Sequence, residues 1–315
     1  MSAAASSDAQ PHLTLPAGLR VFERGWLSSN NVLALDEDEA TLIDSGYVSH
    51  APLTSALVRS ALGGRRLDRI LNTHLHSDHC GGNAALAREH GARILIPPGL
   101  AGAVRDWDVE ALTYDPTGQD CARFDWHEQL APGTRLEFGG LAWEVIAAPG
   151  HDPHAVMFWC DAEGVLISGD VLWEHGFGVI FPELEGESGF AEQAQMLEII
   201  AAIAPRLVIP GHGAVFATVP AALARARARL EALAADPARN ARNAARALLK
   251  FHLLAVGRID EASLLAHLAK ARYFGLINER YFGLSFEDFV TRIVGDLVAS
   301  GAARRDAGLV INSDA

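Results

Sequence analysis

The stretch from Thr73 to Gly82 constrains this chain more than any other, because potential metal ligands crowd into it. Four of them lie within six residues, at His74, His76, Asp78 and His79. Packing does not explain such a cluster, since imidazole is only an intermediate choice for a buried position. The apolar residues 69–72 before it predict a short strand, and if that spacing continues, His74 and His76 point the same way. The two glycines at the end of the stretch then let the backbone approach the site closely.

Three further candidate ligands each follow an apolar run along the chain. The runs are residues 141–150, 164–169 and 206–211, and they lead into His151, Asp170 and His212. Each run predicts a strand that delivers one ligand-type residue into a loop bounded by glycine. Chemistry is commonly carried in this way, on loops that rigid strands hold in place. Together with the first cluster, these strand ends predict that the candidate ligands meet at one metal-binding site.

The order of these motifs resembles that of the metallo-β-lactamase superfamily of metal-dependent hydrolases. The matching pattern is His-x-His-x-Asp-His, then a His after Pro-Gly, then Gly-Asp, then Pro-Gly-His-Gly, over roughly residues 18–218. An early strand that ends at Asp44 fits the same pattern. The resemblance implies an α/β fold, a four-layer αβ/βα sandwich in which two sheets face each other and helices lie outside.

The resemblance also implies a site for two metal ions. One ion would be held by His74, His76 and His151, and the other by Asp78, His79 and His212, with Asp170 as the bridge. Asp44 would lie beneath the site and accept a hydrogen bond from a ligand imidazole, which fixes the tautomer of that ring. Asp78 would in addition orient the attacking nucleophile and so act as the catalytic residue.

The ligand types indicate which metals and which chemistry to expect. Imidazole and carboxylate without thiolate suit zinc, and also iron or manganese. Two divalent ions can share a water, lower its pKa to about 7 and polarise a carbonyl or phosphoryl oxygen. Catalytic metal sites keep a coordination position open for that purpose. The expected mechanism is attack of a bridging hydroxide on carbon or phosphorus, and no Ser-His-Asp or Cys-His grouping in the sequence competes for this function.

Length and composition agree with an enzyme that has an appendage. The 315 residues exceed one average domain, half of them are apolar, and no apolar run is long enough to span a bilayer. We expect a flexible tail over residues 1–17, a catalytic domain over 18–218 and a C-terminal domain over 219–315. The first ten residues of the tail are small and polar and lack the pattern of a signal peptide. The three cysteines, Cys80, Cys121 and Cys160, are odd in number and widely spaced, which favours a reducing, cytoplasmic location. Cys80 is interpreted as a small buried residue rather than a ligand.

Charge is distributed unevenly along the chain. The formal net charge is −13, but residues 221–315 carry 14 Lys and Arg against 10 Asp and Glu, which is +4 and leaves −17 for the remainder. An acidic catalytic body does not attract polyanionic substrates at long range. Bound metal ions would offset part of this charge locally.

The C-terminal segment predicts helices over 220–235 and 240–256, a turn at 257–258 and a helix that ends near residue 271. A further helix should run from the capping pair Ser285 and Asp288 to Ser300, followed by a hairpin within 304–311. This order resembles a winged helix, and some superfamily members, including a branch with ribonuclease activity, carry a similar appendage. A lid or a dimerisation element is favoured over nucleic-acid binding, because +4 is mild and the arginines at 225, 227 and 229 fan out around a helix.

Several residues are candidates for contact with substrate. His154 and His175 follow two ligand loops, and Trp173 begins an apolar and aromatic stretch to residue 182 that should wall the pocket. Trp107 and Trp126, in an insertion over 105–128 with few helix or strand signals, could contribute as well. So could an aromatic-rich loop over 272–282, as a roof. These residues favour a substrate with an apolar acyl part.

The sequence therefore predicts hydrolysis of a small ester, thioester or lactone, in the manner of glyoxalase II or quorum-signal lactonases. Glyoxalase II itself is a poor match, because the C-terminal segment shows no obvious basic cluster for the carboxylates of glutathione. A phosphodiesterase or nuclease is the alternative. Cleavage of β-lactams, iron-dependent persulfide oxidation and a metal-bound scaffold without activity are lesser ones. The expected partner is a small molecule, with nucleic acid less favoured, no membrane, and a homodimer plausible from the exposed aromatics of the tail.

Overall fold

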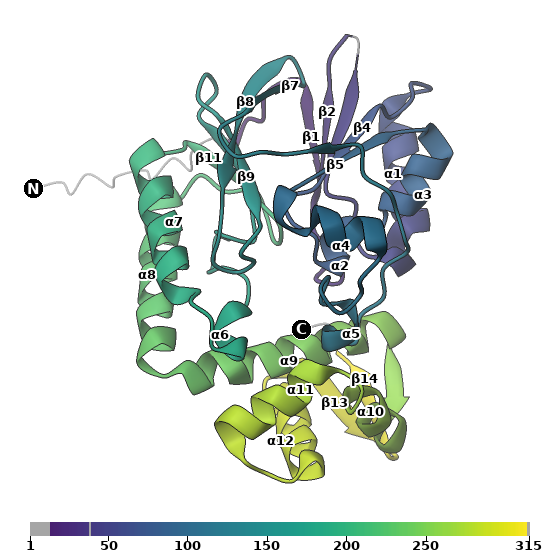
Figure 1. Ribbon diagram of the computed structural model, residues 1–315, viewed down its shortest axis with the longest axis vertical. Helices are drawn as coiled ribbons and strands as arrows, with labels where there is room; N and C mark the ends of the chain where they lie inside the picture. Colours follow the sequence, from purple (N-terminus) through teal and green to yellow (C-terminus); the bar gives the residue numbers. More distant parts are fainter. Residues whose placement is uncertain (1–12, 38, 314–315) are drawn as a thin grey trace, which may run out of the picture.

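Two β-sheets lie face to face at the centre of the computed structural model, which describes residues 13–37 and 39–313 (Figure 1). The first sheet has the order β1-β2-β3-β4-β5-β6, antiparallel from β1 to β3 and parallel from β3 to β6. Its strands are β1 Leu19–Phe22, β2 Asn31–Leu35, β3 Ala40–Ile43, β4 Arg69–Leu71, β5 Arg93–Ile96 and β6 Glu128–Gln129.

The second sheet has the order β11-β10-β9-β8-β7, antiparallel except for the parallel pair β10 and β11. Its strands are β7 Arg135–Phe138, β8 Leu141–Ala147, β9 Val156–Cys160, β10 Val165–Gly169 and β11 Leu207–Pro210. All residues of β9, β10 and β11 are buried, as expected for strands that are covered on both faces.

Side-chain alternation along the strands builds the layers. Ile43 and Leu71 point into the core between the two sheets, whereas their neighbours Leu42 and Ile70 pack under the outer helices. The first sheet is covered by α1 Ala51–Leu62, α3 Asn83–His90 and α4 Ala101–Asp106, and the second by α7 Phe190–Ile203 and α8 Val219–Ala235 (Figure 1). The expected four-layer αβ/βα sandwich is confirmed.

Short elements fill the connections on the side of the sandwich that faces the C-terminal segment. They are η1 Val48–His50, α2 Ser77–Cys80, η2 Pro98–Leu100, α5 Tyr114–Thr117 and α6 Pro182–Glu185. The insertion over 105–128 therefore contains the short helix α5 as well as irregular chain.

The C-terminal elements lie below the sandwich in Figure 1, and their buried residues form a core that also takes in Leu184 of α6. They are α9 Pro237–Val256, β12 Arg258–Asp260, α10 Glu261–Leu268, α11 Arg272–Ile277, the π-helix η3 Asn278–Phe282, α12 Phe286–Ala299, β13 Ala303–Asp306 and β14 Leu309–Asn312. The strands make an antiparallel sheet in the order β12-β14-β13. The apolar residues of α9 recur every three or four positions and bury one face in this core.

Most local predictions for this segment hold. The Ser285 side chain accepts a hydrogen bond from the backbone N–H of Asp288 and begins α12, and the hairpin within 304–311 is formed by β13 and β14. The predicted turn at Gly257 is present, although residues 258–260 continue as a strand because they pair with β14.

The expected loop over 272–282 is wrong, because these residues form α11 and η3. Tyr273 and Phe274 are buried in the C-terminal core, which stabilises helix where the sequence showed only clustered aromatics. The segment therefore supplies packing for that core instead of a roof over the active site.

The expected tail over residues 1–17 lies mostly outside the described residues, since only residues 13–17 of it are described. At the second boundary, buried residues of α8 such as Ala222 and Leu230 pack against the outer face of the second sheet, while the C-terminal core starts with Ala241 of α9. We therefore propose that the C-terminal domain begins with α9. Within the described part of the chain, no helix is both long enough and apolar enough to cross a membrane.

Candidate metal centre

Several strand ends and strand-following loops converge on one edge of the sandwich. The residues predicted as ligands follow β4, β8, β10 and β11, and Asp44 follows β3. The short helix α2 turns the chain immediately after His76, so that Asp78 and His79 come back over the same edge. The structure thus brings together all seven residues that the sequence singled out as ligands.

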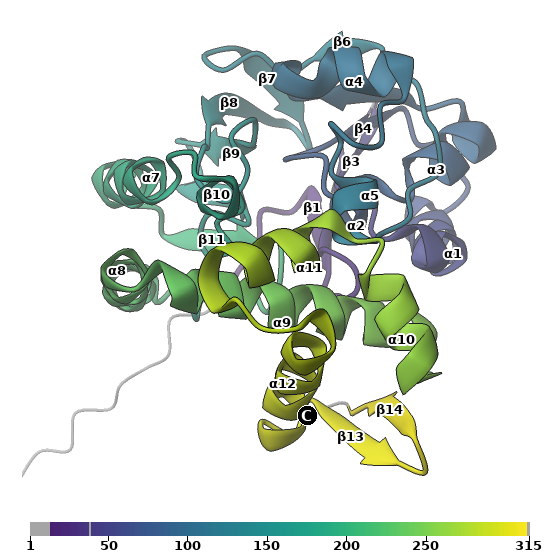
Figure 2. The ribbon, with the colours of Figure 1, turned by 60° about the horizontal axis from the view of Figure 1, so that its bottom comes forward.

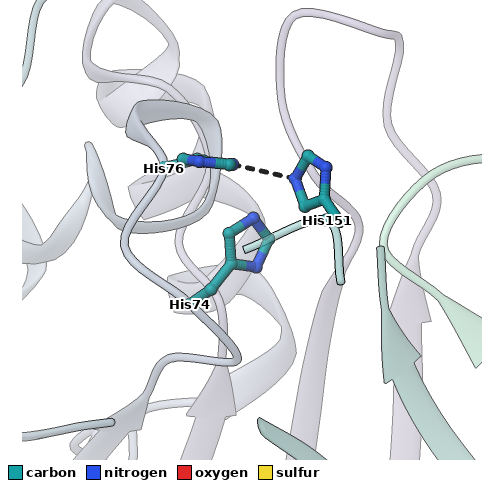
Figure 3. A group of neighbouring side chains, drawn as sticks. All are labelled: His74, His76 and His151. Carbon is teal, nitrogen blue, oxygen red and sulfur yellow. Dashed lines mark hydrogen bonds between the residues drawn. The ribbon is translucent and has the colours of Figure 1, made fainter. Parts of the chain in front are cut away.

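The first group consists of three imidazoles, His74, His76 and His151, whose ligand atoms all lie within 4.8 Å of one another (Figure 3). Nδ1 of His76 and Nε2 of His151 are 2.9 Å apart. Nε2 of His74 is buried and has no hydrogen-bond partner among the described residues. The other ring nitrogen of His151 is held by the carbonyl oxygen of Val179, which fixes the orientation of the ring.

The second group consists of Asp78, His79 and His212, again with ligand atoms within 4.8 Å of one another. Nε2 of His212 is 3.0 Å from Oδ2 of Asp78, and Nε2 of His79 is 3.7 Å from the same oxygen. His79 is fully buried, and its Nε2 atom has no hydrogen-bond partner in the described chain.

Asp170 lies between the two groups. Its Oδ1 atom is 3.5 Å from Nε2 of His79, while its Oδ2 atom is 3.6 Å from Nε2 of His151 and 3.8 Å from Nε2 of His212. The indole of Trp173 donates a hydrogen bond to Oδ1 at 3.2 Å and steadies the carboxylate. A carboxylate that faces nitrogen donors of both groups is placed to touch two cations at once.

The donor set fits two divalent cations. Burial lowers the pKa of His76 and of His151 to about 4, so that both rings are neutral at pH 7, the form that ligates metal. Burial of a polar nitrogen without a partner is costly, and a cation would satisfy the unpartnered Nε2 atoms of His74 and His79. Imidazole and carboxylate donors suit zinc, iron or manganese.

Asp44 orients His79 from below. Its Oδ2 atom lies 2.8 Å from Nδ1 of His79, and its two oxygens also accept hydrogen bonds from the backbone N–H and the hydroxyl of Thr73. Burial disfavours the charged form of His79, but Asp78, Asp44 and Asp170 together raise its pKa well above the usual value. A metal ion would replace the proton on Nε2, while the bond to Asp44 holds the proton on Nδ1.

Two glycines allow the close approach on which this centre depends. A Cβ atom on Gly211 would lie 2.1 Å from Oδ1 of Asp170, and one on Gly178 would lie 2.4 Å from Nδ1 of His151. Any larger residue at either position would displace a candidate ligand. The Pro-Gly-His-Gly motif is therefore needed for space beside Asp170 as well as for turning the chain.

A cavity of about 190 Å³ opens above the two groups. Its floor includes His76, Asp78, His151, Asp170 and His212, and its walls are mostly apolar or aromatic. The wall residues are Trp26, Thr117, Gln119, Trp173, Gly178, Val179, Phe181, Ala247, Leu248, Lys250, Phe251 and Leu254. The last five come from α9, which lies across the open edge of the sandwich (Figure 2).

The substrate-contact predictions have a mixed outcome. Trp173 lines the cavity as expected, and residues 178–181 of the same stretch wall it. His154 lies outside, with its exposed ring against Gly99, and His175 is exposed beside Glu174. The roof is formed by α9, whereas no residue of 272–282 lines the cavity.

The two tryptophans of the insertion lie outside the cavity as well. Trp107 and Trp126 pack against the helical layer over the first sheet, where the indole of Trp126 donates to the carbonyl oxygen of Ala101. The insertion instead lines the cavity with Thr117 and Gln119.

Sequence reasoning missed two residues that flank the ligands. The indole of Trp26 is 57% exposed and stacks on the ring of His212, with centroids 5.3 Å apart and planes at 11°. Asp152 is buried, and its Oδ2 atom lies 3.7 Å from Nε2 of His76. Asp152 could have been identified from the sequence, because it directly follows the candidate ligand His151. No motif near Trp26 in the sequence indicates that it lies beside the site.

A second cavity of about 360 Å³ adjoins the first and shares Trp26, Trp173 and Lys250 with it. Three cations from α8 and α9 line this cavity, namely Arg229, Arg246 and Lys250. Arg229 donates to the carbonyl oxygen of Phe177, Arg246 to Ser300, and Lys250 to acceptors at 302, 312 and 313. The sequence showed no basic cluster in this segment because these residues are spread over two helices.

The fold and the centre together define a class of protein, an αβ/βα sandwich with ligands for two metal ions at one edge of its sheets. The chain belongs to the metallo-beta-lactamase superfamily, whose family model matches residues 24–212. The match contains every residue of the candidate centre. It confirms the resemblance that the motifs indicated.

Curated proteins similar to the chain include hydroxyacylglutathione hydrolases. That of Anaeromyxobacter dehalogenans (strain 2CP-C) is 34% identical over 161 residues, which are 50% of this chain and 52% of that protein. That of Rhodobacter capsulatus is 34% identical over 187 residues, 58% of this chain and 62% of that protein. The chain thus spans about half the length of the curated relatives it matches.

Solved structures share the fold over most of the chain. A metallo-beta-lactamase family protein from Thermus thermophilus is 21% identical with a TM-score of 0.54, and the likeness covers 94% of this chain and 98% of that one. A metallo-beta-lactamase of Cronobacter sakazakii is 20% identical with a TM-score of 0.51, over 88% and 92% of the two chains. Likeness over 94% of the chain includes the C-terminal elements.

Proposed function

We propose that the protein is a metal-dependent hydrolase of small thioesters, esters or lactones. The observation that carries this proposal is a largely buried seven-residue centre that opens into a mostly apolar cavity. When bound there, two divalent ions lower the pKa of a water and polarise a carbonyl oxygen. We propose the ligand assignment that the motifs suggested: His74, His76 and His151 for one ion, Asp78, His79 and His212 for the other, and Asp170 for both.

The chain's own side chains would position the substrate and exclude water. The apolar roof from α9 and the aromatic walls at Trp26, Trp173 and Phe181 suit an acyl group rather than a phosphate. Asp78, whose Oδ2 atom faces the cavity between His79 and His212, is placed to hold a nucleophile by a hydrogen bond. Gln119, also on the wall, offers an amide to the leaving group.

The second cavity supports a substrate with an acidic part beyond the scissile bond. Its cations are Arg229, Arg246 and Lys250, and Lys250 lines the cavity of the metal centre as well. Curated relatives are named for hydroxyacylglutathione, a thioester whose glutathione part carries carboxylates. In the sequence, the lack of an obvious basic cluster argued against a glutathione thioester. Because Arg229, Arg246 and Lys250 lie together in the second cavity, we include a glutathione thioester among the expected substrates.

The charges at the start of α12 and on the hairpin of β13 and β14 do not favour the nuclease alternative. We propose that this domain is winged-helix-like, with α12 in the position of a recognition helix and β13 and β14 as the wing. The exposed part of α12 begins with Glu287 and Asp288, which would repel phosphates. Arg304 and Arg305 of the wing form ion pairs with Asp306 and Glu261.

A cytoplasmic location and a homodimer stay predictions.

The test combines metal analysis with a hydrolysis panel. We expect about two zinc ions per chain and turnover of thioesters, aryl esters or lactones, including a glutathione thioester, with no turnover of a phosphodiester. His76→Ala and Asp170→Asn should each lower kcat/KM by at least 10²-fold and reduce the metal content. The matched controls His175→Ala and Asp161→Asn change exposed residues outside the cavity and should leave both unchanged.

Three outcomes would contradict the proposal. Full activity in both ligand variants would overturn the two-metal centre as the site of hydrolysis. Turnover of the phosphodiester alone would overturn the proposed acyl substrate in favour of the nuclease, and one iron without hydrolysis would point to persulfide oxidation.

A further inference from the structure

Two cysteines that are distant in the sequence meet beside the metal centre. Cys80 is the last residue of α2, and Cys121 lies in the irregular segment that follows α5. Their Sγ atoms are 3.8 Å apart although 41 residues separate them. Both thiols are free in the structure, so a covalent bond needs only a short approach of the two sulfurs.

The two thiols differ in exposure, which assigns them different functions. Cys80 is fully buried, and its Sγ atom lies 3.3 Å from the carbonyl oxygen of His76 and 3.2 Å from the hydroxyl of Tyr114. Cys121 is partly exposed. An oxidant in solution therefore reaches the thiol of Cys121 first, whereas the buried thiol of Cys80 is not directly accessible to it.

We propose that Cys80 and Cys121 form a reversible disulfide that regulates the metal centre, with a hydroperoxide as the oxidant. In the first step, the Cys121 thiol is oxidised to a sulfenic acid while the hydroperoxide is reduced to an alcohol, or to water in the case of hydrogen peroxide. In the second step, Cys80 sulfur attacks Cys121 sulfur, the S–O bond breaks, and the hydroxyl leaves as water with the proton of the Cys80 thiol. A dithiol reductant restores both thiols.

The bond would act on the wall of the cavity. A disulfide holds its sulfurs about 2.05 Å apart, so the pair must close by nearly 2 Å. Cys80 is held by the backbone bond from its N–H to the carbonyl oxygen of His76, whereas Cys121 lies outside any helix or strand, so the segment of Cys121 moves. Gln119, two residues before it, lines the cavity and accepts a 2.5 Å hydrogen bond from Ser77.

A shift of that size near the reacting groups is expected to lower activity. Misplacement by about 1 Å costs up to 10²-fold in rate when positioning is involved. Cys80 also follows the candidate ligands Asp78 and His79 directly, so strain in the disulfide reaches the second metal group. We expect the oxidised form to have at least tenfold lower kcat/KM than the reduced form.

The covalent part of the proposal can be tested without any substrate. The metal-loaded protein is treated with hydrogen peroxide, free thiols are blocked by alkylation, and the tryptic digest is analysed by mass spectrometry. We expect peptide 70–88 joined to peptide 106–123, with the link lost after dithiothreitol. Cys160 is buried in β9 within the core between the sheets, so its thiol should remain unoxidised and react with the alkylating reagent only after the protein is unfolded. Unlinked peptides, or irreversible oxidation of Cys121 alone, would overturn the disulfide.

The regulatory part is tested on the substrate found with the hydrolysis panel and so rests on the proposed function. Peroxide should lower kcat/KM of the native protein reversibly, whereas Cys121→Ser should keep its activity under the same treatment. The matched control Cys160→Ser should lose activity as the native protein does. Equal sensitivity of Cys121→Ser would overturn regulation through this pair. Absence of any hydrolysis would contradict the proposed function alone, because the peptide link is measured separately.

Discussion

At the scale of single residues, the centre depends on groups that hold the ligands as much as on the ligands themselves. Asp44 has a positive φ of 56°, which is uncommon for a residue other than glycine. That conformation lets one carboxylate bond both Thr73 and His79 beneath the site. The backbone strain at this position is consistent with a function in orienting the ligand.

We predict that Asp44→Asn weakens metal binding while the fold stays intact. The amide cannot hold the proton on Nδ1 of His79 as the carboxylate does, and loss of such a partner costs about 10- to 100-fold in metal affinity. The measurement is competition for zinc with a chromophoric chelator. Asp68→Asn is the matched control, since this carboxylate accepts a hydrogen bond from Ala40 in the same sheet but lies away from the ligands. Unchanged affinity in Asp44→Asn would contradict the orienting function.

At the scale of elements, α9 joins the two halves of the molecule. One face packs in the C-terminal core, and Phe251 and Leu254 line the cavity of the metal centre. Near its end, His252 stacks on His267 of α10, with ring centroids 3.7 Å apart. Burial, together with the nearby His267, lowers the pKa of His252 to about 4, and burial also lowers the pKa of His267.

The stacked pair makes the stability of the protein depend on pH. Because the pKa of His252 is lower in the folded protein than the usual 6.5, the unfolded chain binds more protons between pH 6.5 and 4. We therefore predict that the free energy of unfolding falls as the pH falls through that window, and that His252→Phe reduces this dependence. Denaturant unfolding at pH 7 and pH 4.5 measures it, with His175→Phe as an exposed control. The same pH dependence in His252→Phe as in the native protein would show that His252 does not cause it.

At the scale of the whole molecule, the metal centre lies where the layers meet. Its candidate ligands come from loops of both sheets, so a bound metal would link the two halves of the sandwich. The cluster of buried imidazoles and carboxylates is costly without cations, because several nitrogen atoms then have no partner. Metal binding should therefore contribute to the stability of the whole catalytic part.

Removal of metal is predicted to lower the melting temperature. A ligand present at 100 times its Kd stabilises the folded state by about 2.7 kcal/mol, which corresponds to several degrees for a domain of this size. Treatment with a chelator, followed by differential scanning calorimetry, should show this decrease, and added zinc should reverse it. In Asp170→Asn, the melting temperatures of the metal-loaded and the chelator-treated protein should differ by less than they do in the native protein. A melting temperature that is unaffected by verified loss of metal would contradict the linkage.

The sequence alone singled out the candidate ligands, because they lie in short-range motifs, and the order of those motifs carried the resemblance that implies the sandwich. The ligands are short-range motifs at strand ends, so the spacing from His74 to His79 already places them at one edge. The capping pair at Ser285 is equally local.

Only the tertiary structure decided what surrounds those ligands. The stacking of Trp26 on His212, the roof from α9, the cations of the second cavity and the approach of Cys121 to Cys80 all join segments that lie far apart in the chain. Residues 272–282 became helical for the same reason, because burial in the C-terminal core outweighed their weak local pattern. Periodicity reports which face of an element is buried, but not which distant element covers it, and that choice depends on the packing of the complete chain.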